Sequence, residues 1–132
     1  MITIEQYGHT EEEFNELDGW WRNYGAQSPP KGCLPKLGVW AMDGGERVAS
    51  AFLYMDNSVG VSMLEWLIGK PGINPVVLKC SLEAVVDFMR GECRDMGYNV
   101  MFSHCHSDVL SSIVGRLGFS KLETVNSMVA IP

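Results

Sequence analysis

The sequence predicts one α/β (α+β) domain, residues 1–132, in which helices flank a mixed, mainly antiparallel sheet. Three observations lead to this fold class. The chain has 132 residues, enough for one hydrophobic core and too few for two. Hydrophobic residues make up 46% and charged residues 20%, the balance of a globular protein rather than a disordered one. Helix-like and strand-like patterns alternate, and a tight turn joins two strands in the first half.

The first elements are a short strand and a capped helix. Residues 2–7 are rich in β-branched side chains and alternate in polarity, which predicts a strand. Thr10 and Glu13 form a T-x-x-E capping box, and apolar residues at helical spacing follow until Gly25. Three prolines and a glycine interrupt residues 26–36, so this segment should be a loop.

A β-hairpin is the clearest signal of the first half. Two apolar runs, 37–42 and 47–56, flank an Asp-Gly-Gly-Glu turn at 43–46. A third strand is expected at 59–68. These three strands should form the centre of the sheet.

The second half predicts a long helix and shorter closing elements. Asn74 is a favourable N-cap and Pro75 a favourable first helical residue, and Gly97 should end this helix after Met96. The other elements expected are a strand at 98–104, a short helix at 107–117 and one or two strands within 119–131.

Charge and composition exclude several classes of function. The net charge is −6, which makes nucleic acid an unlikely partner. Residues 1–66 hold ten acidic and four basic residues, whereas residues 67–132 hold six of each. The acidic half therefore suits a cationic partner, and an anionic ligand should bind to the second half. No apolar run is long enough to cross a membrane.

The cysteines and the N-terminus suggest a cytoplasmic protein. No basic segment followed by an apolar one begins the chain, so export is not expected. The four cysteines form no CxxC pair. We expect reduced, mostly buried thiols.

The loop between the third strand and the long helix is a candidate anion site. Gly69 and Gly72 precede the helix that opens at Asn74, and open N–H groups at such a junction can hold a pyrophosphate. A plain strand-to-helix turn is the alternative. The loop has neither the Walker sequence nor the triple-glycine dinucleotide fingerprint.

With this junction and the Arg116-Leu117-Gly118-Phe119 turn, the order of elements resembles the Gcn5-related N-acetyltransferase (GNAT) superfamily. The resemblance covers nearly the whole chain. Residues 38–68 are also similar to small acetyltransferase-like proteins of bacteriophages. The GNAT resemblance implies an acyl-CoA N-acyltransferase-like fold. It also implies direct transfer of an acetyl group from acetyl-CoA to a primary amine on a small molecule or a protein.

The resemblance also implies which residues bind acetyl-CoA. The loop would cradle the pyrophosphate, backbone N–H groups near Leu67 would hold the thioester carbonyl, and Ser107 would contact the cofactor or the leaving thiolate. The expected cofactor-binding residues are Leu67, Ile68, Gly69, Lys70, Gly72, Ile73, Asn74 and Arg116.

The sequence departs from the family pattern at four positions. The family loop reads Arg/Gln-x-x-Gly-x-Gly/Ala, but Gly69 and Asn74 stand at its first and last positions here. Ser107 replaces an asparagine that often opens the short helix, and Val114 replaces the tyrosine that commonly protonates the leaving thiolate. Pro75 also lacks the N–H that could face a phosphate.

Glu65 is the first candidate for catalysis. By strict alternation it shares a strand face with Val61, Met63 and Leu67, so its carboxylate lies among apolar neighbours. Such burial raises the pKa of a carboxyl and suits a base that deprotonates an attacking ammonium. The alternative is a structural glutamate that pairs with an arginine or a buried polar group.

Two further groups suggest contacts with a substrate. His104 and His106 would face the same way on a strand, but no second pair of ligands accompanies them, so we expect no metal site. His104 or His106 could instead line the substrate cleft as an acid or base, or simply end a strand. Trp20, Trp21 and Tyr24 form an aromatic patch that would suit an amine; the alternative places Trp21 and Tyr24 in the core and Trp20 as a lid over the sheet.

Two alternative functions are also consistent with the sequence. One is a non-catalytic domain of the same fold that binds the cofactor as a regulator or binds another protein. The other is a virion or host-takeover factor that uses only its aromatic surface. A homodimer through exposed strand edges near the C-terminus is possible with any of them.

Overall fold

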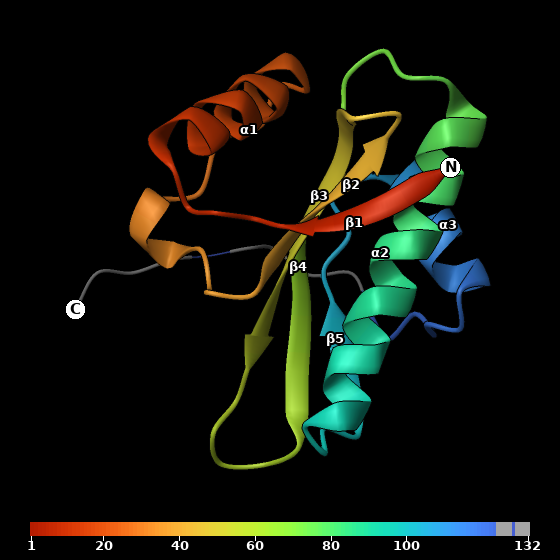
Figure 1. The fold of residues 1–132 in the computed structure, drawn as a ribbon. Helices are drawn as coiled ribbons and strands as arrows, with labels where there is room; N and C mark the ends of the chain where they lie inside the picture. Colours follow the sequence, from red (N-terminus) through yellow and green to blue (C-terminus); the bar gives the residue numbers. More distant parts are fainter. Residues whose placement is uncertain (124–127, 129–132) are drawn as a thin grey trace.

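The computed structural model describes residues 1–123 and residue 128, and it confirms the predicted fold class (Figure 1). Five strands and three α-helices alternate along the chain in this part of the protein. A single 3-10 turn, η1, lies within the proline-rich loop. The elements are β1 (Ile2–Gln6), α1 (Glu11–Asn23), η1 (Lys31–Cys33), β2 (Gly38–Asp43), β3 (Glu46–Met55), β4 (Val61–Gly69), α2 (Pro75–Asp95), β5 (Val100–Ser103) and α3 (Asp108–Arg116).

The sheet is mixed and follows the order of the chain. Strands β1 to β4 pair antiparallel with their neighbours, and β5 pairs parallel with β4. The β4–β5 pairing runs from Val61 opposite Val100 to Leu64 opposite Ser103 and ends there. Strand β4 continues to Gly69, and among the described residues this last part of the strand pairs with β3 alone, through Glu65, Ile68 and Gly69.

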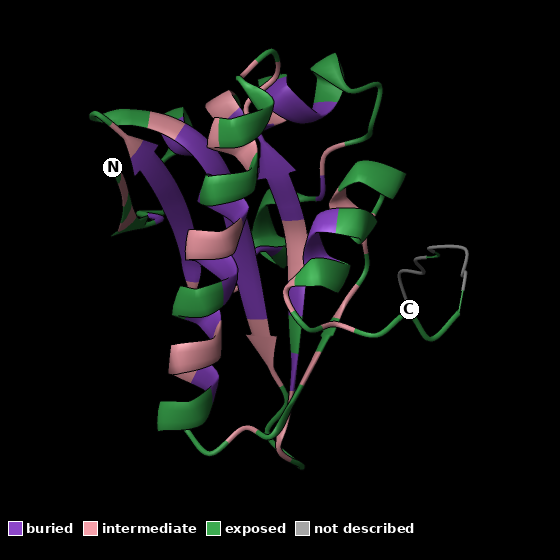
Figure 2. Cartoon of the chain, turned by 90° about the vertical axis from the view of Figure 1, so that its right-hand side faces the viewer, coloured by how far each residue is buried: buried purple, intermediate pink, exposed green. Residues whose placement is uncertain are grey.

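Helices cover both faces of the sheet. Figure 1 shows α1 on one side of the sheet and α2 with α3 on the other. Burying both faces gives two apolar clusters, one under α2 and α3 and one under α1. Figure 2 shows the buried residues gathered on the strands and on the side of α2 that faces them.

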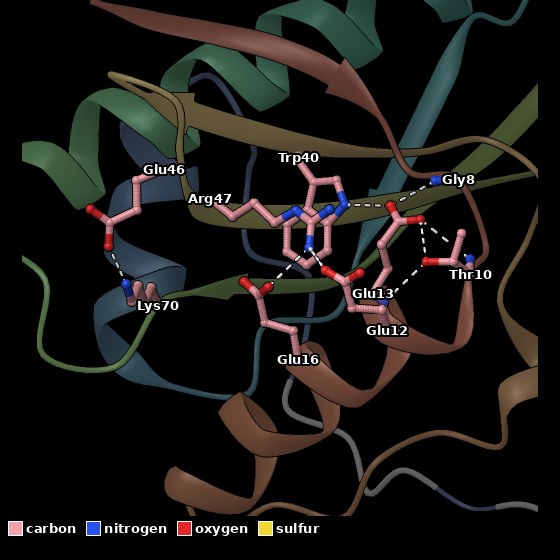
Figure 3. Close-up of polar contacts among 9 residues, drawn as sticks. All are labelled: Gly8, Thr10, Glu12, Glu13, Glu16, Trp40, Glu46, Arg47 and Lys70. Atoms are coloured by element: carbon pink, nitrogen blue, oxygen red, sulfur yellow. Dashed lines mark hydrogen bonds and ion pairs between the residues drawn. The ribbon is translucent and has the colours of Figure 1, made fainter.

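The capping box fixes the start of α1. The Thr10 side chain accepts a hydrogen bond from the Glu13 backbone, and Glu13 bonds back to Thr10, as predicted (Figure 3). Glu13 is buried, and the Trp40 indole and the Gly8 N–H each donate to it at 2.8 Å. Burial alone would raise the pKa of this carboxyl, but these bonds together lower it to about 2.

The hairpin and the start of α2 also form as predicted. Gly44 and Gly45 adopt positive φ angles of 57° and 84° in the turn between β2 and β3, a conformation that favours glycine. The Asn74 side chain accepts a hydrogen bond from Val76 N–H at 2.8 Å, and Pro75 is the first helical residue of α2.

A β-bulge in β4 overturns one prediction about strand faces. Trp66 has a φ of 57°, and the register with β3 shifts between Ile68 opposite Ser50 and Glu65 opposite Phe52. The extra residue breaks the alternation, so Leu67 packs in the cluster under α2 while Trp66 turns to the α1 side. Leu67 therefore does not share a face with Glu65.

Other expectations are corrected or lie outside the described residues. Residues 119–123 contain no strand, and the rest of the expected closing strands falls on 124–131, of which only residue 128 is described. Cys93 is buried, Cys105 is half-buried, and Cys33 and Cys80 are exposed, so the prediction of mostly buried thiols is wrong. Over residues 1–123, no helix is both long and apolar enough to cross a membrane.

Candidate active site

The candidate site lies where β4 and β5 separate. Glu65 is the first residue of β4 beyond the paired stretch, and His104 directly follows β5. Their side chains meet, with His104 Nδ1 2.5 Å from Glu65 Oε1. The Glu65 side chain is only 13% exposed, whereas that of His104 is 55% exposed. A sheltered carboxylate is therefore in direct contact with an imidazole that reaches solvent.

Burial raises the pKa of the Glu65 carboxyl above its ordinary value. The hydrogen bond from His104, the charge of His104 and the charge of His106 oppose this effect without cancelling it. A carboxylate with a raised pKa is a stronger base than an exposed one. The position of Glu65 and its raised pKa therefore suit the removal of a proton from a bound group.

Three side chains beside Glu65, those of Trp66, His106 and Tyr54, form an aromatic wall. Neither Trp66 nor Tyr54 was predicted from the sequence as a site residue. The bulge turns the Trp66 indole toward His106, and the two rings stack at 6.2 Å between centroids. Trp66 Nε1 donates to the Tyr54 hydroxyl at 2.9 Å, and that hydroxyl donates to the Cys33 carbonyl. Burial, with smaller contributions from Cys33 and Glu65, raises the pKa of Tyr54.

The register of the hairpin could have located part of this wall. Tyr54 lies opposite Met63, two residues before Glu65 on the same face of β4. Pairing β3 with β4 from the sequence would have placed Tyr54 near Glu65. Its hydroxyl is engaged as both donor and acceptor, so Tyr54 holds Trp66 rather than offering a free proton.

The loop after β4 is built for close packing. A Cβ on Gly69 would lie 2.2 Å from Leu78 Cδ1, so a larger residue here would displace the end of that side chain. Gly72 adopts a φ of 79°, and Lys70 N–H donates to Val48 O at 2.9 Å. Ile73 packs against the core. The loop is therefore fixed against both the hairpin and α2.

The donors of this loop are partly used within the protein. Asn74 occupies the N–H of Val76, and Pro75 has none, so two donors of the first turn of α2 are not free for an anion. The Lys70 ammonium pairs with Glu46 across the hairpin turn (Figure 3). The loop therefore offers few free donors to an anion such as a pyrophosphate.

The predicted residues of α3 lie at its two ends. Ser107 is the N-cap, and its hydroxyl accepts a hydrogen bond from Leu110 N–H at 3.1 Å. Arg116 is exposed in the last turn and donates to Ser112 Oγ at 3.3 Å. Val114 is buried in the core. Arg116 is therefore accessible to an anion, and Ser107 already has a structural role.

The aromatic residues of α1 divide between core and surface. Trp20 and Trp21 are both buried, with their rings edge-on to Trp40 and Trp66 respectively. Tyr24 is exposed, contrary to its alternative assignment to the core, and its hydroxyl donates to Gly69 O at 2.9 Å. Ile68 is buried in the same cluster as the two tryptophans. Trp21 therefore borders the aromatic wall at Trp66.

The described part of the chain contains no cluster of side chains suited to binding a metal ion. No group of three or more histidine, cysteine, aspartate or glutamate side chains converges there in a way that could hold a metal ion. Glu65 and His104 form a pair, and His106 is held against Trp66.

Comparisons with known proteins show the fold. No protein-family model and no curated protein matches the sequence. Among solved structures, a probable acetyltransferase has a TM-score of 0.72 at 14% identity and covers 100% of this chain and 98% of its own. A GNAT-family acetyltransferase from Streptococcus pneumoniae has a TM-score of 0.65 at 14% identity, and the match covers 100% of this chain and 98% of that protein.

A third similar structure is an aminoglycoside acetyltransferase from an uncultured soil metagenomic sample, solved with sisomicin. It gives a TM-score of 0.69 at 12% identity and covers 99% of this chain and 97% of its own. These identities are too low to carry a function over. The agreement extends over the whole chain, and this protein therefore has the fold of the GNAT acetyltransferases.

Proposed function

We propose that this protein transfers an acetyl group from acetyl-CoA to a primary amine. The observation that carries the proposal is the sheltered Glu65 carboxylate, with its raised pKa, at the point where β4 and β5 separate. The fold adds support, because similar structures are named as acetyltransferases. The resemblance of residues 38–68 to small phage proteins extends the proposal to a phage-encoded enzyme in the host cytoplasm.

Glu65 acts as the general base in the proposed reaction. It accepts one proton from the acceptor's ammonium, directly or through water, and His104 orients its carboxylate. The neutral amine then attacks the thioester carbonyl, a C–N bond forms, and the C–S bond breaks. The second proton leaves the nitrogen as the amide forms, and it ends on the thiolate of coenzyme A.

The backbone after Glu65 holds the acetyl donor. Within the described residues, no strand pairs with β4 on the β5 side from Glu65 onward, so backbone groups near Leu67 can bond to the donor's chain, and an N–H there would stabilise the oxyanion. The loop residues Gly69, Gly72 and Asn74 would lie along the pyrophosphate, with Lys70 and Arg116 offsetting its charge. Trp20, Trp21 and Tyr24 would support the acceptor side of the site.

The test of this function is the Glu65→Gln variant. We expect release of coenzyme A in the presence of an accepted amine to fall at least about a hundredfold, the range for loss of a general base. Binding of acetyl-CoA, measured by isothermal titration, should stay within about twofold of the wild type. Glu5→Gln serves as the control, because Glu5 is an exposed glutamate on another strand. Full activity in Glu65→Gln would assign the base to another group.

A second candidate is a domain that binds acetyl-CoA without turnover. The observations in its favour are the few free donors of the loop and the pairing of Lys70 with Glu46. If this second candidate is right, acetyl-CoA binds saturably but no amine is acetylated. The Glu65→Gln variant should then match the wild type in both binding and lack of product. Mass spectrometry of the amines after incubation separates the two candidates.

A further inference from the structure

We infer that the acceptor is a monocationic primary amine on an apolar body, such as an alkyl or arylalkyl chain. The inference rests on the proposed function and names the class of substrate for the same site. It is drawn from a strip of exposed and half-buried apolar side chains that runs along β4 and β5 and ends at Glu65 and His104. We refer to Val61, Met63, Val100 and Phe102 as the apolar strip.

The register of the two strands places the strip. Val61 pairs with Val100, and Met63 pairs with Phe102. Side chains two residues apart on a strand share a face, so Glu65 follows Met63 and His104 follows Phe102 on the same face. The contact between Glu65 and His104 confirms that the two rows converge. The strip therefore leads directly to the proposed base.

The strip is open where other apolar side chains of the sheet are covered. Met63, Phe102 and Val100 are 39%, 41% and 45% exposed. Helix α1 lies over the other end of this face, where Phe52 and Ile68 are buried, and does not reach the lower half of β4 (Figure 1). Exposed apolar side chains arranged side by side mark a binding surface more often than scattered ones do.

The charge at the end of the strip fixes the head group of the ligand. Glu65 is the one acid in the two rows, and an ammonium is the group that complements it and needs its proton removed. The nearest carboxylate at the other end of β4 is Asp56, in the turn that precedes the strand, and the four residue steps from Val61 to Glu65 span about 13 Å. Its oxygen is engaged by Ser58 and Val59.

Several acids near α1 are already paired with basic side chains of this protein. Arg47 lies 3.0 Å from Glu16 and 3.7 Å from Glu12, and Lys70 pairs with Glu46 (Figure 3). Along the strip itself, a polycation would find one carboxylate, Glu65, and otherwise an apolar surface. One charge with an apolar body matches both features.

The test compares amines that differ only in the body. With saturating acetyl-CoA, release of coenzyme A is measured for propylamine, butylamine, pentylamine, hexylamine and 2-phenylethylamine. We expect kcat/KM to rise at least about tenfold from propylamine to hexylamine, since each buried methylene contributes up to about fourfold. The amine 1,6-diaminohexane has the same length with a second cation, and it should be at least about tenfold poorer than hexylamine.

Two matched variants assign the effect to the strip. Phe102→Ser should lower kcat/KM for hexylamine about tenfold and leave propylamine within about twofold. Phe88→Ser is the control, because Phe88 is 37% exposed on α2, away from the strip. Equal rates for hexylamine and 1,6-diaminohexane, or equal losses in both variants, would overturn the inference while leaving the proposed function in place.

A binding measurement keeps the inference testable without turnover. With acetyl-CoA present, hexylamine should shift the NMR signal of the Met63 methyl group but not that of Met89, which is fully buried. Absence of this shift overturns the inference. A second copy seated on the strip also overturns it, and would appear as a dimer that Phe102→Ser dissociates. Failure to bind acetyl-CoA at all would instead count against the proposed function.

Discussion

At the scale of single residues, Glu65 and His104 divide two tasks between them. Glu65 is sheltered, so its pKa is raised, and His104 is exposed, so the pair connects the interior of the site with solvent. The base works only when deprotonated, so kcat/KM should rise as the pH rises through the pKa of Glu65. That rise should centre above the ordinary glutamate value of 4.5.

Removing His104 should move this pH profile in a defined direction. The hydrogen bond and charge of His104 lower the pKa of Glu65, so their loss in His104→Ala raises it further. We therefore expect the midpoint of kcat/KM against pH to move to higher pH. His9→Asn is the control, since His9 instead contacts Lys36 O at 3.1 Å. An unmoved midpoint in His104→Ala would show that the contact does not act on the base.

At the scale of elements, one buried carboxylate joins β1, α1 and β2. Glu13 begins α1, accepts from Gly8 just after β1, and accepts from Trp40 on β2 (Figure 3). Its pKa of about 2 lies below the 4.5 of an unperturbed glutamate. The folded state therefore gains stability from the ionised carboxylate above pH 4.5, and this stability is lost as the pH falls toward 2.

The Glu13→Gln variant tests this junction. The gap between the two pKa values corresponds to about 3 kcal/mol of unfolding free energy at pH 7. Urea unfolding at pH 7 should show a loss of that order in Glu13→Gln, and the difference from the wild type should shrink below pH 4. Glu11→Gln, an exposed residue of the same turn, is the control. A loss that stays constant from pH 7 to pH 3 would contradict the role of ionisation.

At the scale of the whole molecule, binding of acetyl-CoA should appear as thermal stability. A ligand at a hundred times its Kd adds about 2.7 kcal/mol to the unfolding free energy, which raises the Tm of a domain this size by several degrees. Glu46→Gln should enlarge this rise, because it frees Lys70 for a phosphate. Differential scanning fluorimetry with and without acetyl-CoA measures both effects. A rise in Tm no larger than that of the wild type would show that the ion pair does not compete with the ligand.

Local chemistry made much of this fold predictable. The capping box at Thr10, the turn at Gly44 and the N-cap at Asn74 each depend on neighbours in sequence, and each forms as predicted. Glu65 was identified because a carboxylate in an apolar strand is rare, and the structure shelters it.

The rest of the site depends on contacts between distant residues. The bulge at Trp66 breaks the strict alternation that placed Leu67 beside Glu65, and nothing in the order of residues 61–69 marks it. The stacking of His106 on Trp66 and the bond from Trp66 to Tyr54 follow from that bulge and from the register. Tyr24 had helical spacing typical of the core, yet it is the C-cap residue of α1 and is exposed.

The early end of the β4–β5 pairing has a consequence for backbone dynamics. Between Glu65 and Gly69, the amides that point away from β3 face no strand among the described residues, so they should exchange their protons with solvent faster than those at 61–64. A bound thioester chain would take the place of the missing strand. Slower exchange at these few amides, without a change elsewhere in the sheet, would then report occupancy of the site one residue at a time.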